Sequence, residues 1–268
     1  GMEVILDVVY NHTAEGGTGG EEYNFKIMAE DVFYTKDKDG KFTNYSGCGN
    51  TLNCNHKVVK DMIIQSLLYW YLEVGVDGFR FDLAPILGRD ADSQWARYSL
   101  LHELVEHPIL AHAKLIAESW DLGGYFVGAM PSGWSEWNGA YRDTVRRFIR
   151  GDFGQVTELI KKIFGSVDIF HSNKNGYQAS INFICCHDGF TMWDLVSYNI
   201  KHNLLNGENN QDGENNNHSY NHGEEGLTEN PKILALRKQQ IKNMLLILYI
   251  SQGIPMLLMG DEMGRTQL

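Results

Sequence analysis

The chain has 268 residues, of which 43% are apolar and 12% aromatic, so it is long enough to bury one large core as a single globular domain. Its formal net charge is −11 and its pI is near 5.3. These values argue against nucleic acid or an anionic membrane as a partner, because both favour a basic surface. No apolar run reaches the roughly 20 residues that a membrane-spanning helix needs. An uncharged polymer remains compatible with this composition.

Short apolar runs recur along the chain and predict parallel strands. The first run, residues 3–9, is nearly unbroken rather than alternating, which is typical of a strand covered on both faces. Further runs predict strands at 76–82, 113–118, 179–187 and 254–259, with a weaker one at 135–138.

Helical patterns lie between these runs. A helix around 142–149 is expected, and Asn230 followed by Pro231 offers an N-cap and a first helical residue for a helix that runs to about residue 250. Another helix is predicted by one apolar stripe at helical spacing, made of Val59, Ile63, Leu67, Trp70 and Val74. Strands that alternate with helices predict a parallel α/β fold.

The segment 203–228 is rich in Asn, Gly, Glu and His and almost lacks apolar residues, so it is expected to be a loop. Two interpretations stay open. It is either a mobile linker or a substrate-facing loop, since binding loops cluster at the carboxyl ends of the strands in barrel folds.

The four cysteines do not form a disulfide framework. Cys185 and Cys186 are adjacent in a predicted strand, where successive side chains face opposite ways. Cys48 and Cys54 lack the paired Cys-x-x-Cys spacing of a zinc site. We expect four reduced thiols in a reducing compartment.

Three acidic residues each follow a predicted buried strand: Asp82, Glu118 and Asp188. Hydrolysis of an acetal by the two-carboxylate route needs one ionised carboxylate at the anomeric carbon and one protonated carboxyl at the leaving oxygen. A further acid can stabilise the positive charge that develops on the sugar. The pattern therefore points to glycoside chemistry.

The segments around these acids resemble the four ordered motif regions of the α-amylase superfamily: residues 7–12 (DVVYNH), 78–82 (GFRFD), 117–121 (AESWD) and 187–190 (HDGF). Three longer stretches resemble its isoamylase and bacterial glycogen-debranching branch, at residues 44–53, 136–143 and 194–199. The resemblance covers nearly the whole chain. One departure is Ser119, where debranching relatives commonly have Pro, and it affects the expected path of that loop.

The resemblance implies a TIM (β/α)8 barrel, here incomplete, with the six predicted strands as the third to the eighth. Residues 1–268 would form a partial catalytic domain. The first two barrel strands, an amino-terminal β-sandwich module and a carboxy-terminal β domain are expected to lie outside this chain.

The resemblance also implies roles for single residues. Asp82 is the expected nucleophile, with Arg80 beside it on the same strand face to keep it charged, and Glu118 is the expected general acid and base. Asp188 is expected to stabilise the transition state. The substrate-binding candidates are His12, His187, Arg80, Trp120 and Tyr10.

No cofactor or metal is expected. Asn11 matches a position that supports calcium in some superfamily members, but no Asp-rich loop with calcium-ligand spacing is evident.

The expected function is hydrolysis of α-1,6 branch linkages in glycogen or a starch-like α-glucan. Two alternatives stay open: a glucan-binding subunit without activity, and an α-glucan transglycosylase or branching enzyme. The expected partner is the branched glucan alone, without nucleic acid or membrane, and the expected location is the bacterial cytoplasm or, in a plant or alga, a plastid. The sequence leaves the oligomeric state open.

Overall fold

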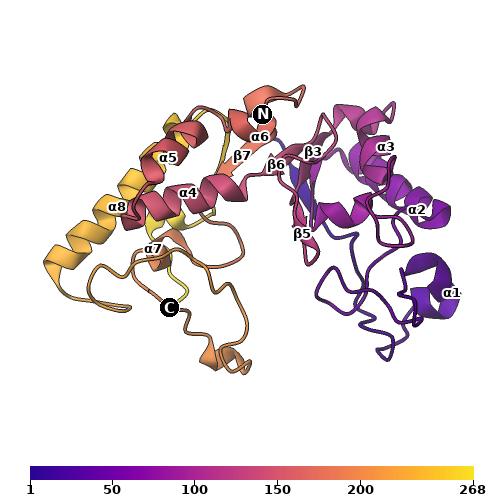
Figure 1. Ribbon diagram of the computed structural model, residues 1–268, viewed down its shortest axis with the longest axis horizontal. Helices are drawn as coiled ribbons and strands as arrows, with labels where there is room; N and C mark the ends of the chain where they lie inside the picture. Colours follow the sequence, from indigo (N-terminus) through magenta and orange to yellow (C-terminus); the bar gives the residue numbers. More distant parts are fainter. The chain divides into compact units, whose positions relative to one another are not determined.

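The computed structural model describes residues 1–268, and they form two compact units. The first unit consists of Gly1–Trp137 with Ser172–Asn175, and the second of Asn138–His171 with Gly176–Leu268. Both contain parallel strands that alternate with helices (Figure 1).

The first unit is built on four parallel strands that neighbour one another in chain order. These strands are β1 (Ile5–Val8), β2 (Gly78–Phe81), β3 (Lys114–Ala117) and β6 (Ser135–Trp137). Val8 lies opposite Phe81, and Phe81 lies opposite Ala117, so the carboxyl ends of the first three strands are level. This register brings the residues that follow the three strands to one edge of the sheet.

Helices and one hairpin complete the first unit. They are α1 (Phe25–Phe33), α2 (Lys57–Leu68), a π-helix (Tyr69–Val74), α3 (Leu100–Glu106), two 3-10 helices (Ala84–Gly88 and Leu110–His112) and the antiparallel strands β4 (Trp120–Asp121) and β5 (Gly124–Tyr125). Figure 1 shows α2 and α3 beside the strands.

The predicted apolar stripe is only partly correct. Val59, Ile63 and Leu67 are fully buried on α2, but Trp70 and Val74 are 38% and 50% exposed. The physical reason is the π-helix that continues α2, because a wider helical turn moves later side chains off a stripe set by 3.6-residue spacing.

The second unit contains two parallel strands, β7 (Ser180–Phe183) and β8 (Ile254–Met256). Its helices are α4 (Gly139–Arg150), α5 (Gln155–Ile163), α6 (Val167–Phe170), α7 (Met192–Leu195), α8 (Pro231–Ile250) and three 3-10 helices (Gly176–Ala179, Leu204–Asn206 and Asp261–Met263). In Figure 1 helix α4 lies alongside both α5 and α8, and it contacts both.

Helix α8 begins as the sequence predicts, since the side chain of Asn230 accepts a hydrogen bond from the Lys232 N–H at 3.1 Å and Pro231 is the first helical residue. The strands, in contrast, are shorter than the apolar runs. The apolar run continues past the end of β7 through Ile184, Cys185 and Cys186, which remain buried. The apolar character of these three residues therefore reflects their burial and not strand pairing.

Each unit has its own core. Phe81 and Trp134 meet edge to face at 5.0 Å in the first unit, while Tyr141, Met244 and Leu248 are buried together in the second. All four cysteines are free thiols. No helix combines the length and the apolar character needed to cross a membrane.

Candidate active site

Two of the three predicted catalytic acids lie at the carboxyl-terminal edge of the sheet in the first unit. Asp82 follows β2, and its backbone N–H donates to the Val8 carbonyl at 3.0 Å. Glu118 follows β3, and its N–H donates to the Phe81 carbonyl at 3.0 Å. The parallel ladder thus continues through both acids and fixes their backbones.

Arg80 is the centre of the charge network. Its Nη1 lies 2.7 Å from Oδ1 of Asp7 and 3.1 Å from Oδ1 of Asp82, and its Nη2 lies 2.8 Å from Oε2 of Glu118. The guanidinium also lies over the ring of Trp137, 4.0 Å from the centroid. One buried cation therefore holds Asp82 and Glu118 side by side.

Glu118 is a buried carboxyl, with a side chain only 3% exposed. Burial raises its pKa from 4.5 to about 8, the charge of Arg80 and the Leu83 N–H oppose this rise, and the neighbouring Asp82 adds to it. The Leu83 N–H donates to Oε2 at 2.9 Å. Near neutral pH this group can keep its proton, as a general acid must.

Asn11 contacts the carboxylate oxygen of Asp82 that Arg80 does not contact. Its Nδ2 donates to the Asp82 carbonyl at 2.9 Å and to Oδ2 at 2.8 Å, and Asn11 is fully buried. Its Oδ1 contacts Nδ1 of His12. Asn11 thus links a predicted substrate-binding histidine to the predicted nucleophile.

The two aromatic candidates differ in their surroundings. The hydroxyl of Tyr10 is 2.8 Å from the Ser66 hydroxyl on α2, and its ring packs against Phe81 at 6.3 Å. Trp120 lies on the hairpin directly after Glu118 and is partly exposed. For both, contact with substrate stays a prediction.

A buried carboxyl that the sequence did not single out is Glu136 on β6. Glu136 lies opposite Ala117, the residue that precedes Glu118 in the chain. Its Oε2 accepts a hydrogen bond from the Gly128 N–H at 2.9 Å. Burial raises its pKa to about 7. In the sequence, Glu136 stands out only as part of residues 136–143, which resemble the isoamylase and glycogen-debranching branch.

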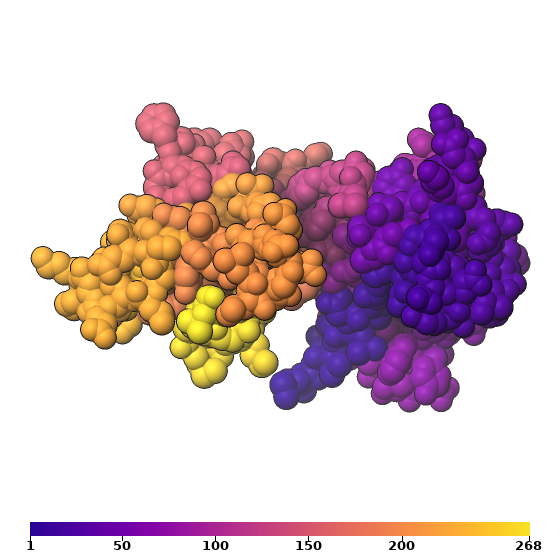
Figure 2. All heavy atoms as spheres, turned by 90° about the horizontal axis from the view of Figure 1, so that it is seen from below, coloured from indigo at the N-terminus to yellow at the C-terminus, as the bar shows by residue number.

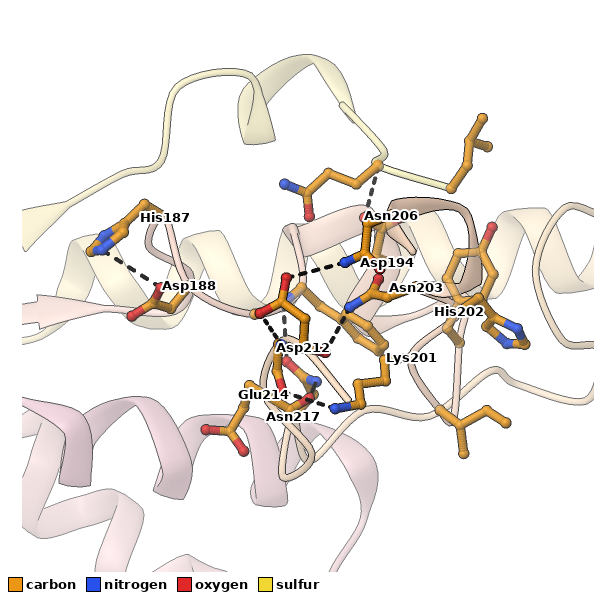
Figure 3. A pocket seen from close by; sticks show the side chains of 17 residues that line it. His187, Asp188, Asp194, Lys201, His202, Asn203, Asn206, Asp212, Glu214 and Asn217 are labelled. Carbon is orange, nitrogen blue, oxygen red and sulfur yellow. Dashed lines mark hydrogen bonds and ion pairs between the residues drawn. The ribbon is translucent and has the colours of Figure 1, made fainter. Parts of the chain in front are cut away.

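The second unit contains Asp188 and His187, beyond the end of β7. Oδ1 of Asp188 lies 3.6 Å from Nε2 of His187, and both side chains are more than half exposed. They line a cavity of about 380 Å³ that Figure 3 shows from close by. This volume falls in the range of about 300–1,000 Å³ that is usual for small-molecule sites.

The other wall of this cavity is formed by the loop 203–228 and the residues just before it. Nζ of Lys201 donates to the carbonyls of Gln211 and Gly213, and Nδ2 of Asn206 donates to Asp212 at 3.1 Å (Figure 3). In Figure 2 the orange atoms of this region form a closely packed part of the second unit's surface. The loop thus lies beside Asp188, and its contact with substrate stays a prediction.

Two buried polar residues, missed in the sequence, hold the loop against the segment that carries Asp188. Nε of Arg146 donates to the Ile184 carbonyl at 2.8 Å, and its Nη1 donates to the Asn217 carbonyl at 3.1 Å. Oδ1 of Asn217 accepts the Phe190 N–H at 3.0 Å. The sequence does not distinguish Asn217 from the other asparagines of this loop, because it differs from them in its burial and not in its residue type.

The structure thus assembles the predicted residues in two groups. Asp82, Glu118 and Arg80 contact one another in the first unit, with His12 joined through Asn11, while His187 and Asp188 line a cavity in the second. No group of three histidine, cysteine, aspartate or glutamate side chains is arranged to hold a metal ion.

Paired carboxyls at the carboxyl ends of parallel strands that alternate with helices are typical of TIM-barrel active sites. The chain belongs to the alpha-amylase catalytic-domain family, whose pattern matches residues 45–268. It is therefore built from the (β/α)8-barrel fold of that family.

Among similar proteins, the chloroplastic isoamylase SU1 of Zea mays is 47% identical over 291 residues, covering 100% of this chain and 37% of that protein. The glycogen operon protein GlgX homolog of Mycobacterium tuberculosis is 50% identical over 272 residues, covering 100% of this chain and 38% of that protein. The chain therefore spans little more than a third of the length of these curated relatives.

A pullulanase from Anoxybacillus sp. LM18-11 is similar in structure, with a TM-score of 0.71 and 28% identity, covering 100% of this chain and 34% of that one. The same enzyme has also been crystallised with maltotetraose. These neighbours support the fold assignment.

Proposed function

We propose that the protein containing this chain hydrolyses α-1,6 branch linkages of glycogen or a starch-like α-glucan with retention of configuration. Asp82 is the nucleophile, Glu118 the general acid and then base, and Asp188 the residue that stabilises the transition state. His12, His187, Arg80, Trp120 and Tyr10 bind the sugar.

The observation that carries this proposal is the shared contact of Asp82 and Glu118 with one guanidinium. Arg80 lies 3.1 Å from Asp82 and 2.8 Å from Glu118, so the two carboxyl groups are neighbours. Retaining glycosidases have carboxyls about 5 Å apart, whereas inverting enzymes separate them by about 6.5–9.5 Å to admit water. The raised pKa of Glu118 supports its role as the proton donor.

In the first step, a carboxylate oxygen of Asp82 attacks the anomeric carbon while Glu118 gives its proton to the departing glycosidic oxygen. The bond to the leaving chain breaks, and a glycosyl ester with Asp82 forms. In the second step, Glu118 takes a proton from water, whose oxygen attacks the same carbon and releases Asp82. Glu118 ends protonated, so both acids return to their starting states.

The choice of α-1,6 linkages rests on the relatives, which include isoamylases, GlgX homologs and pullulanases. Within this proposal the six strands are the third to the eighth of the barrel, and the remaining strands and flanking modules belong to the longer protein. The branched glucan is the substrate. The protein acts in a bacterial cytoplasm or a plastid, since the named relatives are bacterial or chloroplastic.

The test uses the full-length protein with glycogen. Release of reducing ends should fall at least about 100-fold in both Asp82→Asn and Glu118→Gln, because each removes a group needed for the chemical step. Wild-type activity in either variant would contradict the assignment.

Product analysis separates the open alternatives. Linear chains released without new branch points indicate hydrolysis, whereas new linkages with little gain in reducing ends would replace the proposal with a transglycosylase. Binding of glycogen without any product would replace it with a glucan-binding subunit.

A further inference from the structure

The ring of Trp137 on β6 contacts a side chain that comes from two strands away. The guanidinium carbon of Arg80 lies 4.0 Å from the ring centroid, and β3 runs between β2 and β6. Arg80 therefore extends across β3, where it pairs with Glu118, and reaches the tryptophan beyond it. Trp137 is 7% exposed and Arg80 4%, so this contact is shielded from water.

The strand register places this tryptophan on the same face as the two acids. The residues directly before Asp82, Glu118 and Trp137 lie opposite one another on the three neighbouring strands. Asp82, Glu118 and Trp137 therefore form the next row, and the side chains of one row point to the same face. Glu136, one position earlier on β6, points to the other face, where it accepts the Gly128 N–H.

The carboxylates contact only part of the Arg80 guanidinium. Its Nη1 contacts Asp7 and Asp82, and its Nη2 contacts Glu118. Its buried Nε has no hydrogen-bond acceptor. All these groups lie at the edge of the guanidinium, whereas Trp137 covers a flat face. An aromatic face attracts a cation, most strongly where both are removed from water.

The tryptophan contact differs from the ion pair in how it responds to a proton. The charged groups around Glu118 are Arg80 and Asp82, with Asp7 on Arg80. When Glu118 carries its proton, as a general acid must, it has no charge with which to attract Arg80. The indole ring of Trp137 does not titrate, so its attraction for the guanidinium is the same in both states of the acid.

We propose that Trp137 is a positioning residue, whose ring holds the Arg80 guanidinium against Asp82 and Glu118 while Glu118 carries its proton. This inference rests on the proposed function and adds to it a residue that acts through Arg80 and not on the sugar. Without the ring, the long arginine side chain regains rotamer freedom and leaves the two acids.

The first test is the hydrolysis of glycogen by the full-length protein with Trp137→Leu. We expect kcat to fall about 3- to 30-fold, the worth of a buried cation–π contact, with KM within about twofold of wild type. The high-pH limb of kcat/KM, which reports the acid of the free enzyme, should move up by about 0.4 pH unit or more. The reason is that Arg80 opposes the rise in the pKa of Glu118, and this opposition weakens when Arg80 moves away.

Two further variants complete this series. Trp137→Phe keeps a ring with a weaker attraction for cations, so its kcat and its pH limb should lie between those of wild type and Trp137→Leu. It also serves as the test if Trp137→Leu does not fold. The matched control is Trp70→Leu, since Trp70 is 38% exposed on the π-helix of the same unit and should leave both readouts unchanged.

The second test needs no catalysis and measures the urea midpoint of unfolding at about pH 5 and about pH 9. A higher pKa of Glu118 in the folded protein makes the midpoint fall more steeply as pH rises. The fall should therefore be larger in Trp137→Leu than in wild type. In a Glu118→Gln background, Trp137→Leu should leave the fall unchanged, because the titrating group is absent.

Several results would overturn the positioning role of Trp137. They are wild-type kcat with an unmoved pH limb in a folded Trp137 variant, equal effects in Trp70→Leu, or a midpoint that falls equally in Trp137→Leu and wild type. If wild type releases no reducing ends, the proposed hydrolysis fails. The urea series then still decides whether Trp137 holds Arg80 against Glu118.

Discussion

The guanidinium of Arg80 lies 2.8 Å from the carboxyl of Glu118, yet the pKa of Glu118 is raised and not lowered. An adjacent cation normally favours the charged carboxylate. Here burial outweighs it, because the Glu118 side chain is only 3% exposed, and the nearby Asp82 adds to the rise. The site therefore places a carboxyl that can keep its proton beside Asp82, within reach of a single arginine.

The first prediction concerns stability against pH in Glu118→Gln. A carboxyl whose pKa rises from 4.5 to about 8 on folding binds its proton more tightly in the folded state. The contribution of the protonated Glu118 to the free energy of unfolding is full below the unfolded pKa of 4.5. This contribution is lost as the pH rises from 4.5 to about 8. Denaturant titrations at about pH 5 and about pH 8 should show a smaller drop in the free energy of unfolding in the variant than in wild type.

Asp61→Asn serves as the control for this effect, because Asp61 is an exposed carboxyl paired with Lys57 on the surface of α2. It should keep the wild-type drop between the two pH values. An equal drop in Glu118→Gln and wild type would mean that Glu118 does not hold its proton in the folded protein.

The second prediction concerns Arg80→Met. This change leaves the carboxyls of Asp7, Asp82 and Glu118 without their shared cation, so the free energy of unfolding should fall by about 3–5 kcal/mol. Urea denaturation at neutral pH measures the change.

Arg150→Met is the matched control, since Arg150 pairs with Asp152 at a partly exposed position. Its loss should cost no more than about 1 kcal/mol. A comparable cost in both variants would show that the buried network adds nothing beyond a surface ion pair.

The third prediction concerns Asn217→Ala. The change removes the acceptor for the Phe190 N–H and the donor to the Glu214 carbonyl, both in a buried setting. We expect a loss of about 1–3 kcal/mol in stability and a lower kcat on glycogen, because Asp188 adjoins the released segment.

Hydrogen exchange at Phe190 gives an independent readout, and its amide should exchange faster in Asn217→Ala. The control is Asn243→Ala, which removes only contacts between side chains on helix α8. Unchanged protection of Phe190 would rule out Asn217 as the anchor of this segment.

The fourth prediction compares two glycines that both have positive φ. Gly189, next to Asp188, has φ +76°, and a Cβ there would lie 2.7 Å from Oδ1 of Asn217. Gly207 has φ +83°, and a Cβ would meet nothing within 4 Å. Gly189→Ala should therefore lower the melting temperature and the activity more than Gly207→Ala, which carries only the backbone strain of about 1–2 kcal/mol. Equal effects in the two variants would show that the Asn217 side chain can move away from the new Cβ without lowering stability.

The sequence by itself determined the parallel strands and the positions of Asp82 and Glu118 directly after two of them, whereas Asp188 lies five residues beyond the end of β7. Unbroken apolar runs favour strands that are covered on both faces, and β2 and β7 are fully buried as this rule expects. The prediction is wrong for the first run, because β1 is only partly buried and Asp7 on it is exposed.

A polar residue can follow a buried run only where the strand leaves the core. This rule depends only on neighbouring residues, and it placed Asp82 and Glu118 at strand ends. The start of α8 was predictable for the same reason, because Asn230 and Pro231 are adjacent in the sequence. The same rule overestimated strand length at Ile184–Cys186, because burial continues where pairing stops.

Only the tertiary structure decided which groups meet and what charge they carry. The pKa of Glu118 depends on burial by residues from other strands and on Arg80, which lies 38 positions earlier in the chain. The side chains of Arg146 and Asn217 act on backbone carbonyl and N–H groups that any residue supplies, so their sequence context contains no signal. The pairing of Trp120 with Tyr125 depends on a hairpin register fixed by the buried contact between Arg89 and Asp121. Such contacts join residues far apart in sequence, and local patterns do not encode them.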